Sequence, residues 1–275
     1  MTDAYAVMGN PIAHSKSPQI HGQFAKQAQQ DLIYSAMLVP VDGFQKAVHD
    51  FFKGSGKGLN VTVPFKEQAY ELADDLTDRA KTAQAVNTLK LQSNGRILGD
   101  NTDGAGLVRD ITVNQKVALQ GKRILLIGAG GAMRGILQPV LAQNPSEVVI
   151  CNRTHAKALA LAEAFSGLGL INAIEFDQLQ GAFDVIINGT SASLKGELPP
   201  IPVTAIARHS VVCDIMYAKE PTAFLVWAKT LGAIKQIDGL GMLAEQAAVS
   251  FEIWRGTEVN TQTVLKDLRL QLQAL

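Results

Sequence analysis

The sequence has no excess charge of either sign and very few cysteines. Its 25 lysines and arginines balance 25 aspartates and glutamates, so the formal net charge at pH 7 is zero. Proteins that bind nucleic acids usually carry a basic excess, and the balance therefore argues against a nucleic-acid partner. Two cysteines, Cys151 and Cys213, are too few for a disulfide framework or a zinc site. We expect no bound metal.

Long apolar runs are also absent. No stretch approaches the ~20 consecutive apolar residues that a membrane span needs. Residues 1–10 show neither the basic region nor the apolar region of a secretory signal. We therefore expect no membrane association and a cytoplasmic location. The 275 residues are 47% apolar and only 18% charged, which suits a folded chain with a real core, in one large domain or two modest ones.

Strand-like and helix-like segments alternate along almost the whole chain, a pattern typical of parallel sheets with helices on both faces. Ser17, before Pro18, and Asp42 are predicted to cap the first two helices. The expected strands are residues 4–9, 32–39, 58–63, 86–91, 96–99, 124–127, 147–151, 184–188, 210–215 and 233–237. The expected helices are residues 18–30, 42–53, 65–73, 78–85, 107–113, 132–142, 156–165, 242–254 and 261–272.

A glycine-rich turn follows the expected strand 124–127 and opens a second series of strands and helices. Gly128 permits a tight turn, and Gly130 lets the backbone approach a pyrophosphate at the start of the next helix. The strict dinucleotide pattern has a third glycine where this chain has Met133, and Gly131 is present instead. The strand, turn and helix together predict a doubly wound, Rossmann-type domain over residues 105–239.

The end of the next strand indicates which dinucleotide is bound. An NAD site usually has a carboxylate there, which accepts from the ribose 2′-hydroxyl. This chain has Asn152, Arg153 and Thr154, with Lys157 one turn later. Arg153 and Lys157 would attract a 2′-phosphate, so NADP is favoured over NAD. Residues 188–191, Asn-Gly-Thr-Ser, follow another strand at the same sheet edge, where they suit either a ligand or an ordinary turn.

The first domain, residues 1–104, carries polar motifs after its strands. Ser15 and Ser17 are close enough to bind one oxyanion, and alternation puts Asn60 and Thr62 on one face of a strand. These and later motifs, in this order, resemble those of the shikimate dehydrogenase family. The motifs are SKSP at 15–18, NVTVPFK at 60–66, AVNT at 85–88, GDNTDG at 99–104, GAGGA at 128–132 and NRT at 152–154, with residues 213–217 and 238–246 extending the match.

The resemblance implies an NADP-dependent oxidoreductase that reduces 3-dehydroshikimate to shikimate in aromatic amino-acid biosynthesis. It also implies an N-terminal α/β substrate domain and an NADP-binding Rossmann domain, with residues 240–275 returning to the first domain. Lys66 and Asp103 match the catalytic pair. The matched substrate contacts are Ser15, Ser17, Asn60, Thr62, Asn87, Tyr217 and Gln246. The matched cofactor contacts are Asp78, Gly128, Ala129, Gly130, Gly131, Ala132, Asn152, Arg153, Thr154, Lys157, Ile215 and Gly239.

The chemistry of these residue types agrees with the resemblance. A lysine ammonium can stabilise charge on a ketone oxygen and deliver its proton, and a neighbouring carboxylate can accept from a substrate hydroxyl. Taken alone, Lys66 is more commonly an exposed first-turn lysine, and Asp103 a helix cap; their joint occurrence inside two longer motifs favours the catalytic pair. Three alternatives stay open: a relative that oxidises quinate as well as shikimate and can use NAD, a non-catalytic NADPH-binding regulator and a methylene-tetrahydrofolate dehydrogenase-like enzyme. A homodimer is also left open. No role is assigned to the histidines, and His21 is expected on the surface or a helix face.

Overall fold

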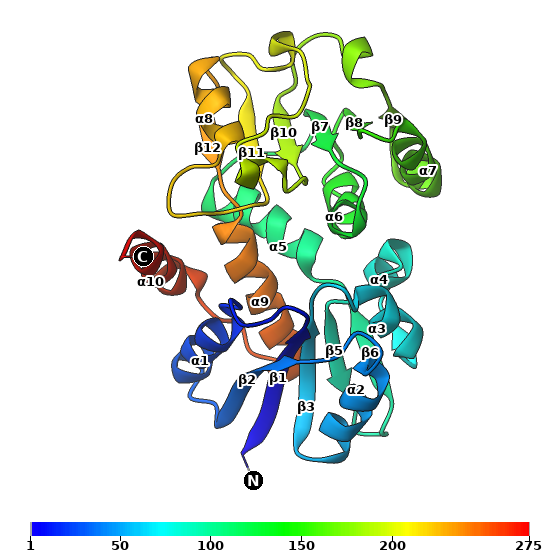
Figure 1. The fold of residues 1–275 in the computed structure, drawn as a ribbon, viewed down its shortest axis with the longest axis vertical. Coiled ribbons are helices and arrows are strands. Elements are labelled where there is room, and N and C mark those ends of the chain that lie inside the picture. Colours follow the sequence, from blue (N-terminus) through cyan, green and yellow to red (C-terminus); the bar gives the residue numbers. More distant parts are fainter. Residues whose placement is uncertain (1, 275) are drawn as a thin grey trace. The chain divides into compact units, whose positions relative to one another are not determined.

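The structure is a computed structural model that describes residues 2–274, and it contains two compact α/β units (Figure 1). The first unit comprises the residues up to 106 together with 244–265. The second comprises 107–243 and the residues from 266 onward. The chain therefore divides at 106 rather than 104, and residues 266–274 group with the second unit. One reason is that Arg269 pairs with Asp238 of that unit at 2.6 Å.

The first unit is built on a mixed six-stranded sheet in the order β2-β1-β3-β5-β6-β4. The β1–β2, β1–β3 and β4–β6 pairs are parallel, and the two ladders of β5 are antiparallel. The strands are β1 (Asp3–Gly9), β2 (Leu32–Leu38), β3 (Gly56–Val61), β4 (Asp75–Leu76), β5 (Thr88–Leu91) and β6 (Ile97–Asp100). Its helices include α1 (Ser17–Gln27), α2 (Phe44–Lys53), α3 (Lys66–Leu72) and α4 (Asp78–Ala83).

Alternate residues of β1 face two different cores in the first unit. Ala6 and Met8 pack with the apolar faces of α2 and α3. Tyr5, one residue away, stacks against Trp254 with ring centroids 4.9 Å apart. Trp254 belongs to α9 (Leu240–Arg255), and α5 (Asp103–Arg109) leads from the first unit into the second. The remaining C-terminal helix is α10 (Thr261–Ala274).

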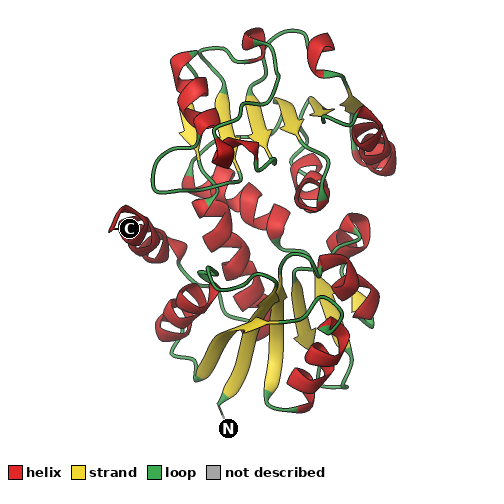
Figure 2. Cartoon of the chain, in the orientation of Figure 1, coloured by secondary structure: helices red, strands yellow, loops and turns green. Residues whose placement is uncertain are grey.

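The second unit has a fully parallel sheet in the order β12-β11-β10-β7-β8-β9 (Figure 2). In chain order this is the 3-2-1-4-5-6 arrangement of the doubly wound dinucleotide-binding fold, which confirms the predicted fold class. The strands are β7 (Arg123–Ile127), β8 (Glu147–Cys151), β9 (Ile171–Ala173), β10 (Val185–Asn188), β11 (Val211–Asp214) and β12 (Lys235–Ile237). The helices are α6 (Gly131–Leu141), α7 (His155–Phe165) and α8 (Ala223–Thr230).

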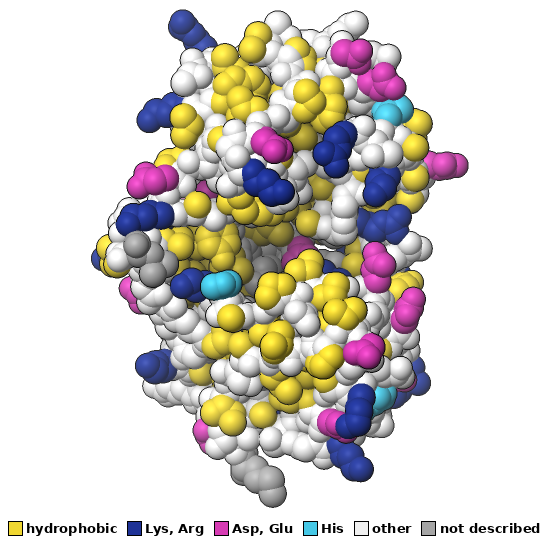
Figure 3. All heavy atoms as spheres, viewed as in Figure 1, with side chains coloured by type: hydrophobic (Ala, Val, Ile, Leu, Met, Phe, Trp, Pro, Cys, Tyr) yellow, Lys and Arg dark blue, Asp and Glu magenta, His cyan; other side chains and the backbone are white. Residues whose placement is uncertain are grey.

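Helices cover both faces of this second sheet, because its strands are apolar on both sides. Ile124 and Leu126 join the core that includes α6 and α7, whereas Leu125 and Ile127 join the core that includes α8. On the face drawn in Figure 3, acidic and basic side chains are interspersed in each unit. Within residues 2–274, no helix is long and apolar enough to cross a membrane. The same residues contain no group of three His, Cys, Asp or Glu side chains arranged to hold a metal ion.

Both predicted helix caps are wrong. Ser17 lies inside α1 as its first residue, and the preceding Lys16 occupies the cap position. The hydroxyl that accepts there belongs to Ser15, whose Oγ is 3.3 Å from the N–H of Ser17. α2 begins at Phe44, after Gly43, so Asp42 is one residue too early to cap it. Both helices nevertheless start within two residues of the predicted positions.

Candidate active site

Lys66 and Asp103 form an ion pair in the first unit. Lys66 is the first residue of α3, and Asp103 is the first residue of α5. The Lys66 Nζ atom lies 2.6 Å from Asp103 Oδ2. The Asp103 side chain is only 9% exposed, whereas that of Lys66 is 24% exposed. The lysine therefore keeps contact with solvent while its counter-charge is buried, an arrangement that suits a group that transfers a proton.

Asn87 holds the other oxygen of the same carboxylate. Its Nδ2 donates to Asp103 Oδ1 at 2.8 Å, and its Oδ1 accepts from the backbone N–H of Thr102 at 2.9 Å. A backbone N–H can only donate, so this contact determines which end of the amide carries the oxygen. Gln246 approaches the same group, with its Oε1 3.4 Å from Thr102 Oγ1. The structure thus brings Lys66, Asn87, Asp103 and Gln246 together.

Asn60 lies next to this group and is buried. Its Nδ2 is 3.2 Å from Thr88 Oγ1 and 3.0 Å from Ser250 Oγ, and its Oδ1 accepts from the Tyr34 hydroxyl at 2.7 Å. Burial raises the pKa of Tyr34 well above its usual value, so the hydroxyl remains a donor at neutral pH. The amide of Asn60 is therefore hydrogen-bonded at both ends by side chains of the protein itself.

Ser15, Ser17 and Thr62 occupy two neighbouring segments of the first unit. Ser17 is buried, whereas Ser15 and Thr62 are half-buried. Thr62 follows β3 and its N–H donates to Met8 O at 3.0 Å, which places it beside the end of β1. Ser15 follows β1 as well, and its N–H donates to Ile12 O. The carboxyl ends of two parallel strands thus carry these three hydroxyl groups.

A second ion pair holds the loop that carries Asp103. The buried carboxylate of Asp100 accepts from Arg79 Nε at 2.6 Å and from Arg79 Nη2 at 2.7 Å. It also accepts from the Thr77 hydroxyl, at 2.7 Å. Asp78, a predicted cofactor contact, lies beside this pair, but its side chain is 97% exposed and sits 3.4 Å from Lys81. The cap of α4 is Thr77 rather than Asp78.

The glycine-rich turn of the second unit joins β7 to α6, as predicted. Gly128 has a φ of +115°, and its N–H donates to Cys151 O at 2.8 Å. Gly130 is the cap residue of α6, and both Gly130 and Gly131 are exposed. Met133 is fully buried in the core beneath the turn. A methionine in place of the pattern's third glycine is therefore accommodated by the core, and Gly130 and Gly131 stay exposed at the start of α6.

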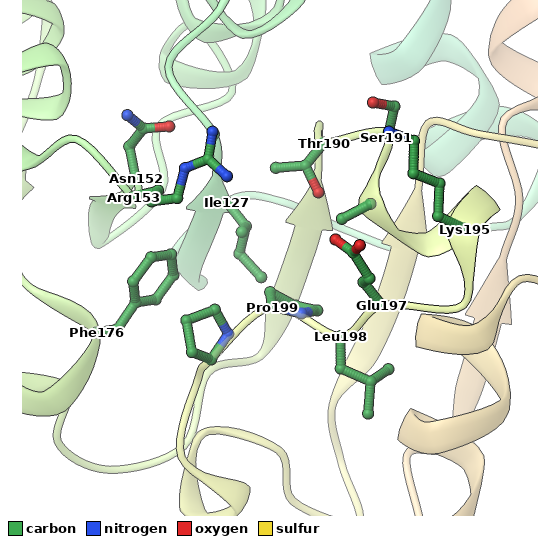
Figure 4. A pocket seen from close by; sticks show the side chains of 13 residues that line it. Ile127, Asn152, Arg153, Phe176, Thr190, Ser191, Lys195, Glu197, Leu198 and Pro199 are labelled. Carbon is green, nitrogen blue, oxygen red and sulfur yellow. The ribbon is translucent and has the colours of Figure 1, made fainter.

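A pocket of about 500 Å³ opens at the carboxyl ends of β7, β8 and β10 (Figure 4). This is the edge where the strand order reverses and where open α/β sheets bind ligands. The side chain of Arg153 extends over the pocket, and the carboxylate of Glu197 points into it from the other side (Figure 4). The lining residues are Ile127, Gly128, Asn152, Arg153, Phe176, Thr190, Ser191, Ala192, Lys195, Glu197, Leu198, Pro199 and Pro200.

Phe176, Thr190 and Ser191 are lining residues outside the predicted cofactor set. Thr190 and Ser191 follow β10, and their place after a strand at this edge is the signal that could have selected them. Phe176 lies in a short helical turn after β9, and no motif singles it out. Thr190 is held by Asn188, whose Oδ1 accepts from the Thr190 N–H at 3.1 Å and from its hydroxyl at 2.8 Å.

The segment after β8 presents cations rather than a carboxylate. Arg153, Thr154 and Lys157 are exposed, and Asn152 Nδ2 donates to Thr154 O at 2.9 Å. Their charge, the exposed turn at Gly130 and the pocket beside them fit a phosphorylated dinucleotide. Burial raises the pKa of the Cys151 thiol to about 12, so the strand end beside this segment carries no reactive thiolate.

Ile215, Tyr217 and Gly239 follow β11 and β12 in the second unit. The Ile215 N–H donates to Asn188 O at 3.0 Å, and the Gly239 N–H donates to Met216 O at 3.1 Å. Burial raises the pKa of Tyr217, and the charge of Asp238 raises it further. Tyr217 therefore presents a protonated hydroxyl. It belongs to the second unit, whereas the other predicted substrate residues belong to the first.

Comparison with known proteins gives three consecutive family matches. Residues 7–89 match the shikimate dehydrogenase substrate binding domain. Residues 111–195 match shikimate / quinate 5-dehydrogenase, and residues 239–269 match the shikimate 5′-dehydrogenase C-terminal domain. A curated relative from Alkalilimnicola ehrlichii, named shikimate dehydrogenase (NADP(+)), is 57% identical over 98% of this chain and 99% of its own length.

Solved structures give the same result. An Ael1 enzyme from Pseudomonas putida aligns with a TM-score of 0.93 at 45% identity, over 97% of this chain and 98% of that one. A shikimate 5-dehydrogenase from Thermus thermophilus, solved in complex with NADP(H) and shikimate, aligns with a TM-score of 0.87. That protein is 28% identical over 98% of this chain and 99% of its own.

Proposed function

This chain belongs to the shikimate dehydrogenase family, and we propose on that basis that it catalyses the reversible, NADPH-dependent reduction of 3-dehydroshikimate to shikimate. The reaction is a step toward chorismate and the aromatic amino acids. The observation that carries the proposal is the Lys66–Asp103 pair, at 2.6 Å, with Asn87 on the second carboxylate oxygen. A ketone reductase needs such a proton donor, whereas a regulator that only binds NADPH does not.

Lys66 is the proposed proton donor. NADPH, when bound, supplies the hydride that reduces the ketone carbon of the substrate. As negative charge develops on the ketone oxygen, an ammonium aimed at that oxygen stabilises the charge and can deliver a proton. Asp103 stabilises the ammonium through its Oδ2 atom and can accept from a neighbouring hydroxyl of the substrate. In the reverse direction Lys66 takes the proton back from the hydroxyl of shikimate.

Two groups of neutral donors are proposed to orient the ring. Thr62, Asn87 and Gln246 suit the ring hydroxyls, since amide and hydroxyl groups can both donate and accept. Asn60 is proposed as a further residue that orients the ring hydroxyls. Its buried amide is held in place by the Tyr34 hydroxyl, which donates to Asn60 Oδ1. Ser15, Ser17 and Tyr217 suit the ring carboxylate. These hydroxyl and amide groups suit the polyhydroxylated ring of shikimate better than they suit a pterin. They therefore favour shikimate over a folate as the substrate.

The second unit is proposed to bind NADP. The turn over residues 128–132 would receive the pyrophosphate at the start of α6, through N–H groups after Gly128, whose own N–H donates to Cys151 O. Arg153, Thr154 and Lys157 would bind the 2′-phosphate, because two cations and a hydroxyl suit a phosphate and no carboxylate of the segment after β8 opposes it. Asn152, Ile215 and Gly239 are proposed as further contacts, as is Asp78.

A spectrophotometric assay of cofactor reduction tests the function directly. Purified protein is given shikimate or quinate, each with NADP+ or NAD+, and kcat/KM is compared for the four combinations. We expect shikimate with NADP+ to be turned over most efficiently. Equal efficiency with quinate and NAD+ would favour the quinate-oxidising relative, and no turnover with any combination would favour the binding regulator.

A cytoplasmic homodimer is proposed for the assembled protein. Both cysteines are unpaired and buried, as suits a reducing compartment. β2 is an edge strand of the first sheet, and Ile33 and Leu38 on it are 61% and 67% exposed. Exposed apolar edge strands tend to pair with another chain. Light scattering should give twice the 29.4 kDa chain mass, and Ile33→Lys should give the single-chain mass.

A further inference from the structure

The hydroxyls of Thr88 and Ser250 lie in direct contact beside the proposed catalytic group. Thr88 begins β5, and Ser250 lies in α9, far along the chain. Their oxygens are 2.8 Å apart, and both side chains have no exposed surface. Neither residue can therefore touch a substrate. Two polar groups buried this completely are costly unless they are hydrogen-bonded, and their partners show what they do.

The side-chain amide of Asn60 donates hydrogen bonds to the hydroxyls of both Thr88 and Ser250. Its Nδ2 lies 3.2 Å from Thr88 Oγ1 and 3.0 Å from Ser250 Oγ, and an amide nitrogen can only donate. Each hydroxyl therefore keeps its single proton for another oxygen. For Thr88 the oxygens in reach are Asn87 Oδ1, at 2.9 Å, and Ser250 Oγ, at 2.8 Å. For Ser250 they are Gln246 O, at 3.0 Å, Thr102 Oγ1, at 3.2 Å, and Thr88 Oγ1. When Ser250 donates to Thr88, the Thr88 proton goes to Asn87 Oδ1.

The Thr102 N–H determines which way the Asn87 amide is turned, and the Thr88 hydroxyl, at 2.9 Å, helps to hold it in place. With Asn87 Oδ1 accepting from both, and from the Thr102 hydroxyl at 3.2 Å, its Nδ2 faces Asp103 Oδ1, at 2.8 Å. If the amide turned over, its oxygen would face a carboxylate oxygen. Both are acceptors, and the pairing at Asp103 would be lost. Asp103 would then be free to move away from Lys66.

We propose that Thr88 and Ser250 are positioning residues that hold the Asn87 amide toward Asp103 and so keep Asp103 paired with Lys66. Thr88 acts on Asn87 directly, and Ser250 acts through Thr88 and through the backbone carbonyl of Gln246. This inference rests on the proposed function for its kinetic consequence. The geometry that it predicts can be tested independently of turnover.

The substitutions Thr88→Val and Thr88→Ser separate the hydroxyl from the shape of the side chain. Valine has nearly the shape of threonine without the hydroxyl, whereas serine keeps the hydroxyl and loses a methyl group. We expect Thr88→Val to lower kcat for shikimate about tenfold, as ~1.4 kcal/mol on the barrier does. Thr88→Ser should recover most of that loss. The Kd for NADP+ should be the same in both variants.

Ser250→Ala and Ser210→Ala form a matched pair. Ser210, in the second unit, is equally buried, and its hydroxyl donates to Phe183 O at 2.6 Å. Both substitutions remove one buried hydroxyl and should lower Tm alike. Only Ser250→Ala should also lower kcat. If kcat falls equally in both variants, or falls in neither, Ser250 has no positioning role.

A crystal structure of Thr88→Val decides the geometry without an assay. We expect the Asn87 amide to be displaced from Asp103 Oδ1, and the Lys66 Nζ to Asp103 Oδ2 distance to lie well beyond 2.6 Å. An unchanged Asn87 and an unchanged ion pair would overturn the inference, whatever the turnover. A wild-type protein inactive with shikimate and NADP+ would instead count against the proposed function alone.

Discussion

Among single residues, the proposed chemistry depends most on Lys66, whose side chain is 24% exposed. We expect Lys66→Ala to lower kcat by roughly 10²- to 10⁴-fold, the usual contribution of a positioned acid, with the Kd for NADP+ nearly unchanged. Steady-state kinetics and a cofactor titration measure the two quantities. Lys57→Ala is the control, because Lys57 is an exposed lysine of the same unit, in β3. Undiminished turnover in Lys66→Ala would remove Lys66 from the mechanism.

Arg153 should determine the choice between NADP and NAD. Arg153→Ser removes a cation from the proposed 2′-phosphate site, and a hydrogen bond to a charged group contributes about 1.5–3 kcal/mol. We expect KM for NADP+ to rise roughly 10- to 100-fold while KM for NAD+ stays the same. Arg208→Ser, at an exposed arginine that does not line the pocket, should change neither. A parallel rise with both cofactors would contradict the assignment.

His21 lies on the buried face of α1. The sequence predicts a surface or helix-face position and assigns it no depth; His21 is 1% exposed and stacks on Tyr34 with ring centroids 4.3 Å apart. Phe24 and Trp254 also contact its ring. Helical periodicity identifies the buried face of α1, but the depth of that face depends on α9, which comes from the far end of the chain. Burial lowers the pKa of His21 to about 3.

This lowered pKa predicts a loss of stability in mild acid. The unfolded chain binds a proton at His21 below its ordinary pKa of 6.5, whereas the folded chain binds it only near pH 3. The contribution of His21 to the free energy of unfolding is therefore complete above pH 6.5 and decreases as the pH drops toward 3. The loss from this group is about 2 kcal/mol at pH 5. Urea unfolding of wild type and His21→Phe at pH 8 and pH 5 measures it.

The difference between the two pH values should be smaller in His21→Phe by that amount. The same substitution at His49, which is exposed on α2, should leave the pH dependence as it is in the wild type. An equal dependence in His21→Phe and the wild type would show that His21 is not the group responsible. Each variant is compared with itself at the two pH values. A packing cost of phenylalanine at the buried site lowers the free energy of unfolding at both pH values and therefore cancels.

At the scale of elements, α5 and α9 cross at Gly106. A Cβ atom on Gly106 would lie 2.5 Å from the Gln246 backbone nitrogen and 2.7 Å from its Cα. Backbone cannot move aside as a flexible side chain can, so Gly106→Ala should shift α9 at Gln246. We expect stability to fall by about 1–3 kcal/mol. The KM for shikimate should rise, with the Kd for NADP+ unaffected.

Gly22→Ala is the matched substitution within α1. Apart from its chain neighbours and the backbone of its own helix, no described atom comes within 4 Å of a Cβ built on Gly22. Alanine is the better helix former, so this variant should gain about 0.5–1 kcal/mol in stability and keep its KM for shikimate. Thermal unfolding and steady-state kinetics of both variants give the comparison. A Gly106→Ala protein with wild-type stability and KM would show that the crossing tolerates a methyl group.

At the scale of the whole molecule, the proposed sites divide between two units. Hydrogen exchange measured by mass spectrometry should therefore separate the two ligands. Shikimate alone should slow exchange chiefly in peptides from residues 1–106 and 244–265. NADP+ alone should slow it chiefly in 107–243, most of all around 128–132 and 152–157. Protection in the opposite units would reverse the assignment of the substrate and cofactor domains.

Features that depend on neighbouring residues could be predicted from the sequence alone. Apolar runs and their alternation with helical segments predicted ten of the twelve strands that the structure describes, because the central strands of the second unit are apolar on both faces. The short strands β4 and β9 were missed, since two or three residues form no run that a pattern can identify. The turn at Gly128 and the cations after β8 were also readable, since each motif is contiguous. Helix caps were not, because Ser17 and Asp42 are plausible caps whose use depends on where the backbone turns.

Only the tertiary structure decided which distant residues meet. Thr88 and Ser250 are 162 positions apart, and nothing in the residues near Ser250 indicates that its hydroxyl contacts β5. The same holds for Phe176, which lines the pocket because β9 lies at the edge of the sheet. Such contacts follow from how α9 and the sheets pack, and packing joins segments whose separation no local pattern encodes. The motifs therefore identify the chemistry, and the fold determines what holds it in place.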